Sequence, residues 1–147
     1  MTYDTLTDAE TRDLRALAGL MIPASATHGV PGADDDLIFA DILRSLERDT
    51  PDAKVALKQL AALSSGAFAD LANERRAEVA ARFKQEGGAP LFALNRVVLL
   101  CYYRDDRVMR SLGQEPRSPF PKGHVVEQGD WSLLDMVRKR PPMWRRV

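Results

Sequence analysis

Apolar residues recur at three- and four-residue spacing along most of the chain, and this spacing is typical of one buried face of an α-helix. Start and stop signals divide the pattern into segments. Thr7 and Glu10 form a capping-box pattern, in which the two side chains satisfy free N–H groups of a first helical turn. We therefore expect a first helix from about Thr7 to Met21, which Pro23 ends.

A loop and a second helix follow. The stretch PASATHGVPGADDD, residues 23–36, is rich in proline, glycine and small polar residues and reads as a loop. It ends in three Asp residues, which suit the positive end of a helix dipole. Ile38 or Phe39, Ile42 and Leu46 then line one face of the second helix.

The middle of the chain predicts two more helices. Thr50 followed by Pro51 suggests an N-cap with proline at the first helical position. This third helix ends where Ser64, Ser65 and Gly66 interrupt the pattern, and its apolar positions are Val55, Leu57, Leu60, Ala61 and Leu63. The next helix is expected from about Asn73, a plausible cap, to Gly87-Gly88, where a glycine can supply the left-handed conformation that ends a helix.

Residues 91–103, LFALNRVVLLCYY, form the most apolar stretch. Its length and its start at Pro90 favour a helix over a strand, and we expect this helix to be central and the most buried. Residues 105–113 add one or two helical turns that end at Gly113.

The pattern changes after residue 115. Prolines 116, 119 and 121 and glycines 123 and 129 exclude a regular helix, and only residues 130–140 return to helical spacing, capped by Asp130. No segment shows clear strand alternation. The sequence therefore predicts an all-α fold, a compact bundle of about five to six short helices (residues 1–115) with an extended Pro-rich C-terminal arm (residues 116–147) that contains a short helix and belongs to the same domain.

Composition narrows the classes of function. A chain of 147 residues suits one domain, and its 21 basic residues balance its 21 acidic ones, so no overall field attracts nucleic acid or an anionic membrane. Cys101 is the only cysteine, which excludes an internal disulfide, and its apolar surroundings predict a buried, inert thiol. No apolar run approaches the roughly 20 residues of a membrane span. Since the first residues resemble no export signal, we expect a cytoplasmic protein; the alternative is a periplasmic one, if a signal was removed or the protein is exported with a partner.

Few residues suggest catalysis. Glycine-rich phosphate loops are missing from the sequence, and the two histidines, His28 and His124, each lie beside a glycine in a predicted loop. Ser25 or Ser118 could be drawn into a triad with them, but neither lies in a G-x-S-x-G turn. The carboxylates of residues 34–36 could bind a divalent cation, yet they lack the alternating ligands of a calcium loop, so solvated residues at a helix start are the better interpretation. We predict no catalytic, cofactor-binding or metal-binding residue in this chain.

The arm is the main candidate for binding, because Phe, Trp, Arg and Met are common anchors of protein interfaces. The predicted partner-binding residues are Pro119, Phe120, Pro121, Trp131, Trp144, Arg145 and Arg146. Two other classes stay open. A small-molecule-binding or enzymatic helical domain would use His124, Glu127 and Asp130, and a nucleic-acid binder would use the basic tail, although the neutral net charge argues against it.

Two segments resemble the gluconate 2-dehydrogenase subunit 3 family. In residues 14–36 a first helix runs into Ile22-Pro23-Ala24 and then into a loop with Pro31-Gly32-Ala33. Residues 101–145 are similar to the C-terminal half of that family, with a Tyr-rich helix, an Asp-x-x-Val step, a Leu-Gly and a Pro-x-Gly turn. The likeness covers most of the chain, through short motifs that are mostly structural.

This resemblance implies a non-catalytic small subunit. It would bind and stabilise a large FAD-dependent sugar or alcohol dehydrogenase or oxidase subunit of the glucose–methanol–choline type, in a hetero-oligomer. The FAD and the catalytic groups would belong to the large subunit, which agrees with the lack of a recognisable site in this sequence. Family members commonly carry a twin-arginine export signal, and this chain departs from that pattern.

Overall fold

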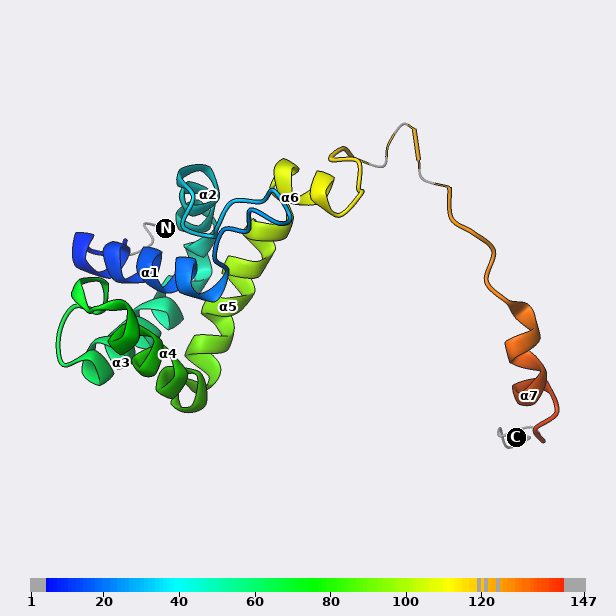
Figure 1. The fold of residues 1–147 in the computed structure, drawn as a ribbon. Coiled ribbons are helices and arrows are strands. Elements are labelled where there is room, and N and C mark those ends of the chain that lie inside the picture. The colour runs from blue at the N-terminus through cyan, green and yellow to red at the C-terminus, as the bar shows by residue number, and fades with distance from the viewer. Residues whose placement is uncertain (1–4, 119, 121, 124, 142–147) are drawn as a thin grey trace. The chain divides into compact units, whose positions relative to one another are not determined.

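The computed structural model describes residues 5–118, 120, 122–123 and 125–141. The chain divides into two compact units, Met1–Pro116 and Arg117–Val147. Helices make up the regular structure of both units (Figure 1), and the described residues contain no strand, only an isolated bridge between Ser25 and Val30. The predicted all-α class is confirmed.

The helices follow one another with short connections. The first unit contains α1 (Asp8–Met21), α2 (Asp36–Leu46), α3 (Thr50–Ser64), α4 (Asn73–Glu86), α5 (Gly88–Tyr103) and α6 (Asp106–Ser111), with 3₁₀ turns η1 (Glu47–Asp49) and η2 (Phe68–Asp70). The second unit contains η3 (Trp131–Leu134) and α7 (Asp135–Arg138). None of the helices within the described ranges combines the length and the apolar character needed to cross a membrane.

The capping box at the first helix is present as predicted. The backbone N–H of Glu10 donates to Thr7 Oγ1 at 3.2 Å, and the N–H of Thr7 donates to Glu10 Oε2 at 2.8 Å. At α2 the last but one Asp of the loop caps the helix, since Asp35 accepts from the N–H groups of Leu37 and Ile38. Both helix starts therefore follow from short polar side chains in the sequence.

The predicted cap of α3 is wrong by one residue. Asp49 holds the N-cap position and Thr50 is the first helical residue, with Pro51 in the first turn. The reason lies in the preceding 3₁₀ turn, which runs directly from Leu46 into α3, so the backbone is already helical at Asp49 and no side chain closes the end. The predicted interruption after this helix is present, because Ser65 adopts the left-handed conformation at φ 58°.

Gly87 separates α4 from α5, and Gly88 is the first residue of α5. Gly88 adopts the left-handed conformation, φ 57°, as a glycine at this junction was expected to do, whereas Gly87 has an ordinary helical φ of −71°. The helix before them begins at Asn73 itself, with Ala72 at the N-cap position, so the predicted cap at Asn73 is also wrong by one residue.

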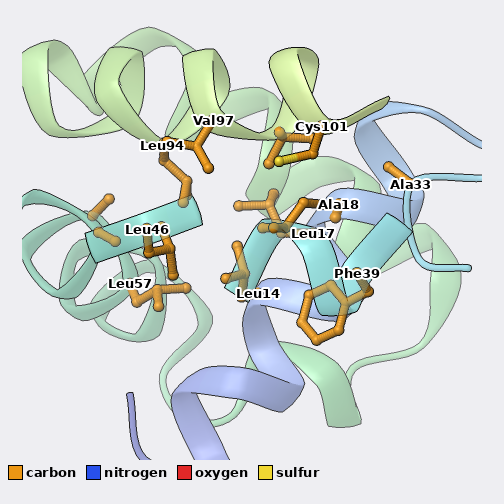
Figure 2. Packing of buried hydrophobic residues seen from close by; sticks show 14 of the residues in the cluster. Leu14, Leu17, Ala18, Ala33, Phe39, Leu46, Leu57, Leu94, Val97 and Cys101 are labelled. Carbon is orange, nitrogen blue, oxygen red and sulfur yellow. The ribbon is translucent and has the colours of Figure 1, made fainter. Parts of the chain in front are cut away.

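One apolar core lies among the helices of the first unit. Figure 2 shows Leu94, Val97 and Cys101 of α5 pointing toward residues of α1 and α2, among them Leu17 and Leu46. The fully enclosed members include two aromatic residues, Phe68 and Phe83. Aromatic side chains are among those that bury the largest apolar surface per residue. The predicted inward positions Ile38, Phe39, Ile42, Leu46, Leu57 and Leu60 are all buried, while Val55 is exposed.

The helix expected to be the most buried is covered on one side only. Leu91, Leu94 and Val98 of α5 are buried, but Phe92 and Tyr103 on its other side are more than half exposed. Contacts from α2, α3 and α4 cover the inner face (Figure 1). The helix predicted to be the central and most buried one is therefore covered on its inner face only, because the other helices of a unit of this size reach only one face of α5.

Arg107 at the start of α6 joins the caps of two helices. Its guanidinium donates to both carboxylate oxygens of Asp35, at 2.6 and 3.2 Å, and to both oxygens of Asp105, at 2.9 and 3.0 Å. Asp35 caps α2 and Asp105 caps α6. These hydrogen bonds from Arg107 are the main cause that lowers the pKa of both carboxyls. The bridge thus holds the start of α6 against the start of α2.

We expect the free energy of unfolding to decrease as the pH falls below about 4. A carboxyl whose folded pKa is lowered stabilises the fold above its unfolded pKa and loses that contribution as the pH falls through its folded pKa. Asp35, Asp105 and Asp41, whose pKa is lowered mainly by a hydrogen bond from Arg104, all act in this direction. Urea unfolding followed by circular dichroism between about pH 7 and pH 3 measures the decrease.

Two variants show whether Arg107 causes that decrease. Arg107→Met should be less stable than the parent at neutral pH and should lose less stability on acidification. Arg110→Met is the matched control, because its ion pair with Asp106 is exposed on both sides and should contribute little. Parallel pH profiles for Arg107→Met and the parent would contradict the assignment.

Candidate partner-binding site

Phe120 lies in the sequence between Ser118 and Gly123, and the carbonyls of these two residues both accept from one arginine. Arg117 donates from Nη2 to the carbonyl of Gly123 at 2.8 Å and from Nη1 to the carbonyl of Ser118 at 3.1 Å. Gly123 has a φ of 67°, a left-handed turn conformation that favours glycine. The side chain of Phe120 is 86% exposed. The loop therefore presents an aromatic ring to solvent, and the ring contributes no core contact.

Trp131 is the first residue of η3. The carboxylate of Asp130 accepts from the backbone N–H of Ser132 at 3.0 Å and from its hydroxyl at 2.6 Å, which starts η3 as the sequence predicted. The indole Nε1–H of Trp131 donates to Gln128 Oε1 at 3.2 Å, and the ring remains 60% exposed. The indole is therefore fixed by a local hydrogen bond and leaves its apolar faces open.

Exposed apolar side chains continue through the rest of the described second unit. Every described residue from 120 to 141 is exposed. The large apolar ones are Phe120, Val125, Val126, Trp131, Leu133, Leu134, Met136 and Val137. Exposed apolar groups at this density are typical of protein interaction sites. Residues 116–118, 120, 122–123 and 125–141 are the described part of the arm.

Several predicted binding residues lie outside the described residues. These are Pro119, Pro121, Trp144, Arg145 and Arg146. His124, the centre of the alternative small-molecule site, is also outside them. Of the other two residues proposed for that site, Asp130 serves as the cap of η3 and Glu127 is exposed.

The acidic loop before α2 has structural partners. Asp36 forms an ion pair with Arg15, and the carbonyl oxygen of Asp34 accepts from the same guanidinium at 2.8 and 3.0 Å. Asp35 caps α2 and binds Arg107. Within the described residues, no group of three His, Cys, Asp or Glu side chains is arranged to hold a metal ion. Asp35 thus caps α2, while Asp34 and Asp36 both contact Arg15.

The remaining candidate nucleophiles and bases have local roles. His28 is exposed, and its backbone N–H donates to Ser25 Oγ at 3.3 Å in the turn that the Ser25–Val30 bridge closes. Cys101 is 1% exposed, and burial raises the pKa of its thiol. A thiol of raised pKa stays protonated at neutral pH and is a poor nucleophile. None of these groups forms a nucleophile–base pair in the described structure.

Sequence reasoning missed one surface, the outer face of α5. An open hollow of about 620 Å³ lies along this face. Its apolar walls are Phe92, Leu99, Leu100 and Tyr103, and Asn95, Arg96 and Arg104 complete the lining. The sequence did contain an indication of this surface. Residues 91–103 place apolar side chains on every side of a helix, whereas the other helices of a small domain cover only one side.

The two arginines beside this face are paired within the chain. Arg96 Nη2 lies 2.5 Å from Asp49 Oδ2, and Arg104 Nε lies 2.5 Å from Asp41 Oδ2. Arg104 also donates to the hydroxyl of Ser45. The outer face of α5 is therefore apolar at its centre and electrically balanced at its edge.

Comparison with known proteins identifies no relative: no protein-family model, no curated protein and no solved structure matches this chain.

Proposed function

We propose that this chain is a non-catalytic small subunit that binds and stabilises a large FAD-dependent sugar or alcohol dehydrogenase or oxidase subunit. The class of the partner comes from the resemblance of residues 14–36 and 101–145 to the gluconate 2-dehydrogenase subunit 3 family. The FAD belongs to the large subunit in this proposal, and this chain supplies no ligand to it. The arm makes the contact.

The exposure of the arm's large apolar side chains is the observation that carries the proposal. A protein that keeps Phe120 and Trp131 in water loses the free energy that burial of two aromatic side chains would provide. Binding to a larger surface recovers it, and aromatic residues of this kind dominate the energy of many interfaces. The helical unit has its own core, so the arm is available for a partner without loss of that core.

A catalytic role has less support from the described residues. General acid–base or nucleophilic catalysis needs two polar groups within hydrogen-bond reach of each other and of a substrate. The strongest charged cluster, Arg107 with Asp35 and Asp105, uses its hydrogen bonds to cap two helices. Its lowered carboxyl pKa values are those of a structural ion pair.

Co-expression tests the proposal. The tagged chain should co-purify with the FAD-dependent dehydrogenase encoded beside it, as a yellow complex with flavin absorbance and with dehydrogenase activity that neither chain shows alone. A colourless protein that leaves the flavoprotein in the flow-through would overturn the proposal.

Substitutions in the arm test its role. Phe120→Ala and Trp131→Ala should each weaken the affinity for the flavoprotein by about thirtyfold, the effect of losing a residue that contributes about 2 kcal/mol to an interface. Their thermal unfolding should match that of the parent, because both side chains are exposed. Leu37→Ala is the matched control, since Leu37 is an equally exposed apolar residue on α2. Equal affinities for all four proteins would show that the arm is not the contact.

A further inference from the structure

A hollow of about 480 Å³ lies between α1, α4 and α5. Its lining includes Leu17, Phe83 and Leu91, which belong to the core and are only 3%, 1% and 7% exposed. The hollow therefore reaches down to the core between three helices and does not lie on the surface of one. Concave sites of about 300–1,000 Å³ with mostly apolar walls are typical of small-molecule binding.

Small side chains on α4 explain why this space is open. Ala77, Ala80 and Ala81 all line the hollow, and their spacing places them on one face of the helix. The helix itself packs mainly on α3, while α1 packs mainly on η2 and α3, so α1 and α4 do not close on each other. The apolar atoms around such a space lack dispersion contacts, which a ligand of matching shape would supply.

One charge accompanies the apolar walls. Lys84 is the only charged residue that lines the hollow, and apart from Asn95 the rest of the lining is apolar. Lys84 is exposed, and it forms no hydrogen bond or ion pair with another described residue. Its neighbours one turn away, at positions 80, 81, 87 and 88, are alanines and glycines, so the local sequence provides no acid to neutralise it. The hollow therefore suits a ligand with an apolar body and an anionic end.

A second apolar hollow of similar size lacks this excess of positive charge. It lies between α1 and α3 and also measures about 480 Å³. Lys54 and Lys58 line it, but Glu10 and Asp13 line it as well, so its formal charges cancel. Charge thus distinguishes the two hollows and favours an anionic ligand in the one beside Lys84.

We propose that the hollow between α1, α4 and α5 binds a free aliphatic carboxylate with a single unbranched chain, a medium-chain fatty acid. The alkyl chain lies against Leu17, Phe83 and Leu91, and the carboxylate meets the ammonium of Lys84 at the water-facing end. The proposal is independent of the flavoprotein, because it concerns the first unit and is tested on this chain alone.

Calorimetric titration of the full chain with octanoate and decanoate tests the proposal. Decanoate should bind at one site with a dissociation constant of about 10–100 µM. Octanoate should bind about fifteenfold more weakly, because each buried methylene contributes about fourfold to the affinity. Decyltrimethylammonium, a cation with the same chain, should bind about tenfold more weakly than decanoate. Saturation that is absent for decanoate, or equal affinity for the anion and the cation, would overturn the proposal.

A membrane is the other source of acyl chains, and vesicles distinguish it from a free acid. Vesicles of phosphatidylglycerol should not retain the protein in a flotation assay, because the proposed site takes one chain with its own carboxylate. Retention on the vesicles, with release by decanoate, would assign the hollow to membrane lipid and contradict the proposal.

Filling the hollow tests its position. Ala81→Leu places a larger side chain in the lining and should weaken decanoate binding by about tenfold or more. Because Ala81 is exposed, thermal unfolding of the variant should match that of the parent. Ala40→Leu, at an exposed alanine of α2 outside the hollow, is the matched control and should bind as the parent does. Equal affinities for the two variants would show that the ligand binds elsewhere.

Removing the charge tests the role of Lys84. Lys84→Met should weaken decanoate binding by about three- to fivefold, the usual effect of an exposed ion pair, without weakening the binding of decyltrimethylammonium. Lys58→Met is the matched control, an exposed lysine of α3 that lines the other hollow. If Lys58→Met weakens the binding and Lys84→Met does not, the ligand occupies the other hollow and the assignment is wrong.

Discussion

Phe68→Ala should lower the free energy of unfolding by about 3–5 kcal/mol, the usual effect of deleting a fully enclosed aromatic ring from a core. Phe68 is 0% exposed and lies in η2, a single turn between α3 and α4. Such a turn has few hydrogen bonds of its own, so burial of the Phe68 ring contributes much of the free energy that holds the turn against the helices. A loss of this size is a large fraction of the stability of a small domain. Urea unfolding followed by far-UV circular dichroism measures it.

Two polar residues, Asp13 and Arg76, also bind η2. A variant of Asp13 therefore distinguishes the contribution of the Phe68 ring from that of the hydrogen bonds. The buried carboxylate of Asp13 accepts from the backbone N–H of Ala69 at 2.8 Å, and Arg76 donates to the carbonyls of Ala69 and Leu71. Asp13→Ala keeps the ring but leaves that N–H without its acceptor, so it should cost about 1–3 kcal/mol, less than loss of the ring. Phe120→Ala is the exposed control and should be neutral. If Phe68→Ala is as stable as Phe120→Ala, the turn is not part of the core.

Gly87→Ala should destabilise the protein by about 1–3 kcal/mol, the cost of inserting an extra carbon into a packed interior. A Cβ at this position would lie 2.7 Å from the Cβ of Leu91 and 2.8 Å from the carbonyl oxygen of Phe83. Both residues are buried, and the carbonyl belongs to the backbone of α4, so neither can move aside freely. Since Gly87 has an ordinary helical φ, the cost comes from space and not from conformation.

Gly129→Ala is the control for that measurement. A Cβ at Gly129 meets nothing within 4 Å, and no left-handed φ is found there. The change should leave the thermal midpoint of unfolding where it is in the parent, while Gly87→Ala lowers it by several degrees, about 2–8 °C for a domain of this size. Equal midpoints for the two variants would contradict the packing that the structure shows between α4 and α5.

Local polar signals made the helices predictable. Thr7 with Glu10 and the Asp34–Asp36 run specify helix starts through short-range hydrogen bonds, which depend on neighbours in sequence alone. The two shifted starts, at Thr50 and Asn73, share one feature. In both cases the polar residue expected to cap the helix is instead its first helical residue, and no side chain closes the end. Sequence patterns of single residues do not fix such boundaries to within one position.

Contacts between residues far apart in the chain could not be predicted from the sequence. The bridge from Arg107 to Asp35 joins residues 72 positions apart, and nothing near either residue marks the other as its partner. The same is true of the outer face of α5, because a fully apolar helix reads as fully buried until the number of covering helices is known. For the candidate site, the sequence predicted which residue types of the arm could bind, and the structure adds that Phe120 and Trp131 are exposed. Their contact with a partner stays a prediction.

The buried position of Cys101 allows the rate of its chemical modification to report local opening of the core. The chain has a single thiol, and that thiol lies in the core against α1 and α2 (Figure 2). A disulfide reagent can modify it only when α5 separates from these helices, so the rate of modification reports how often that separation occurs. No label or engineered residue is needed. A ligand, a partner or a second copy that holds α5 in place should slow this rate in proportion to its occupancy.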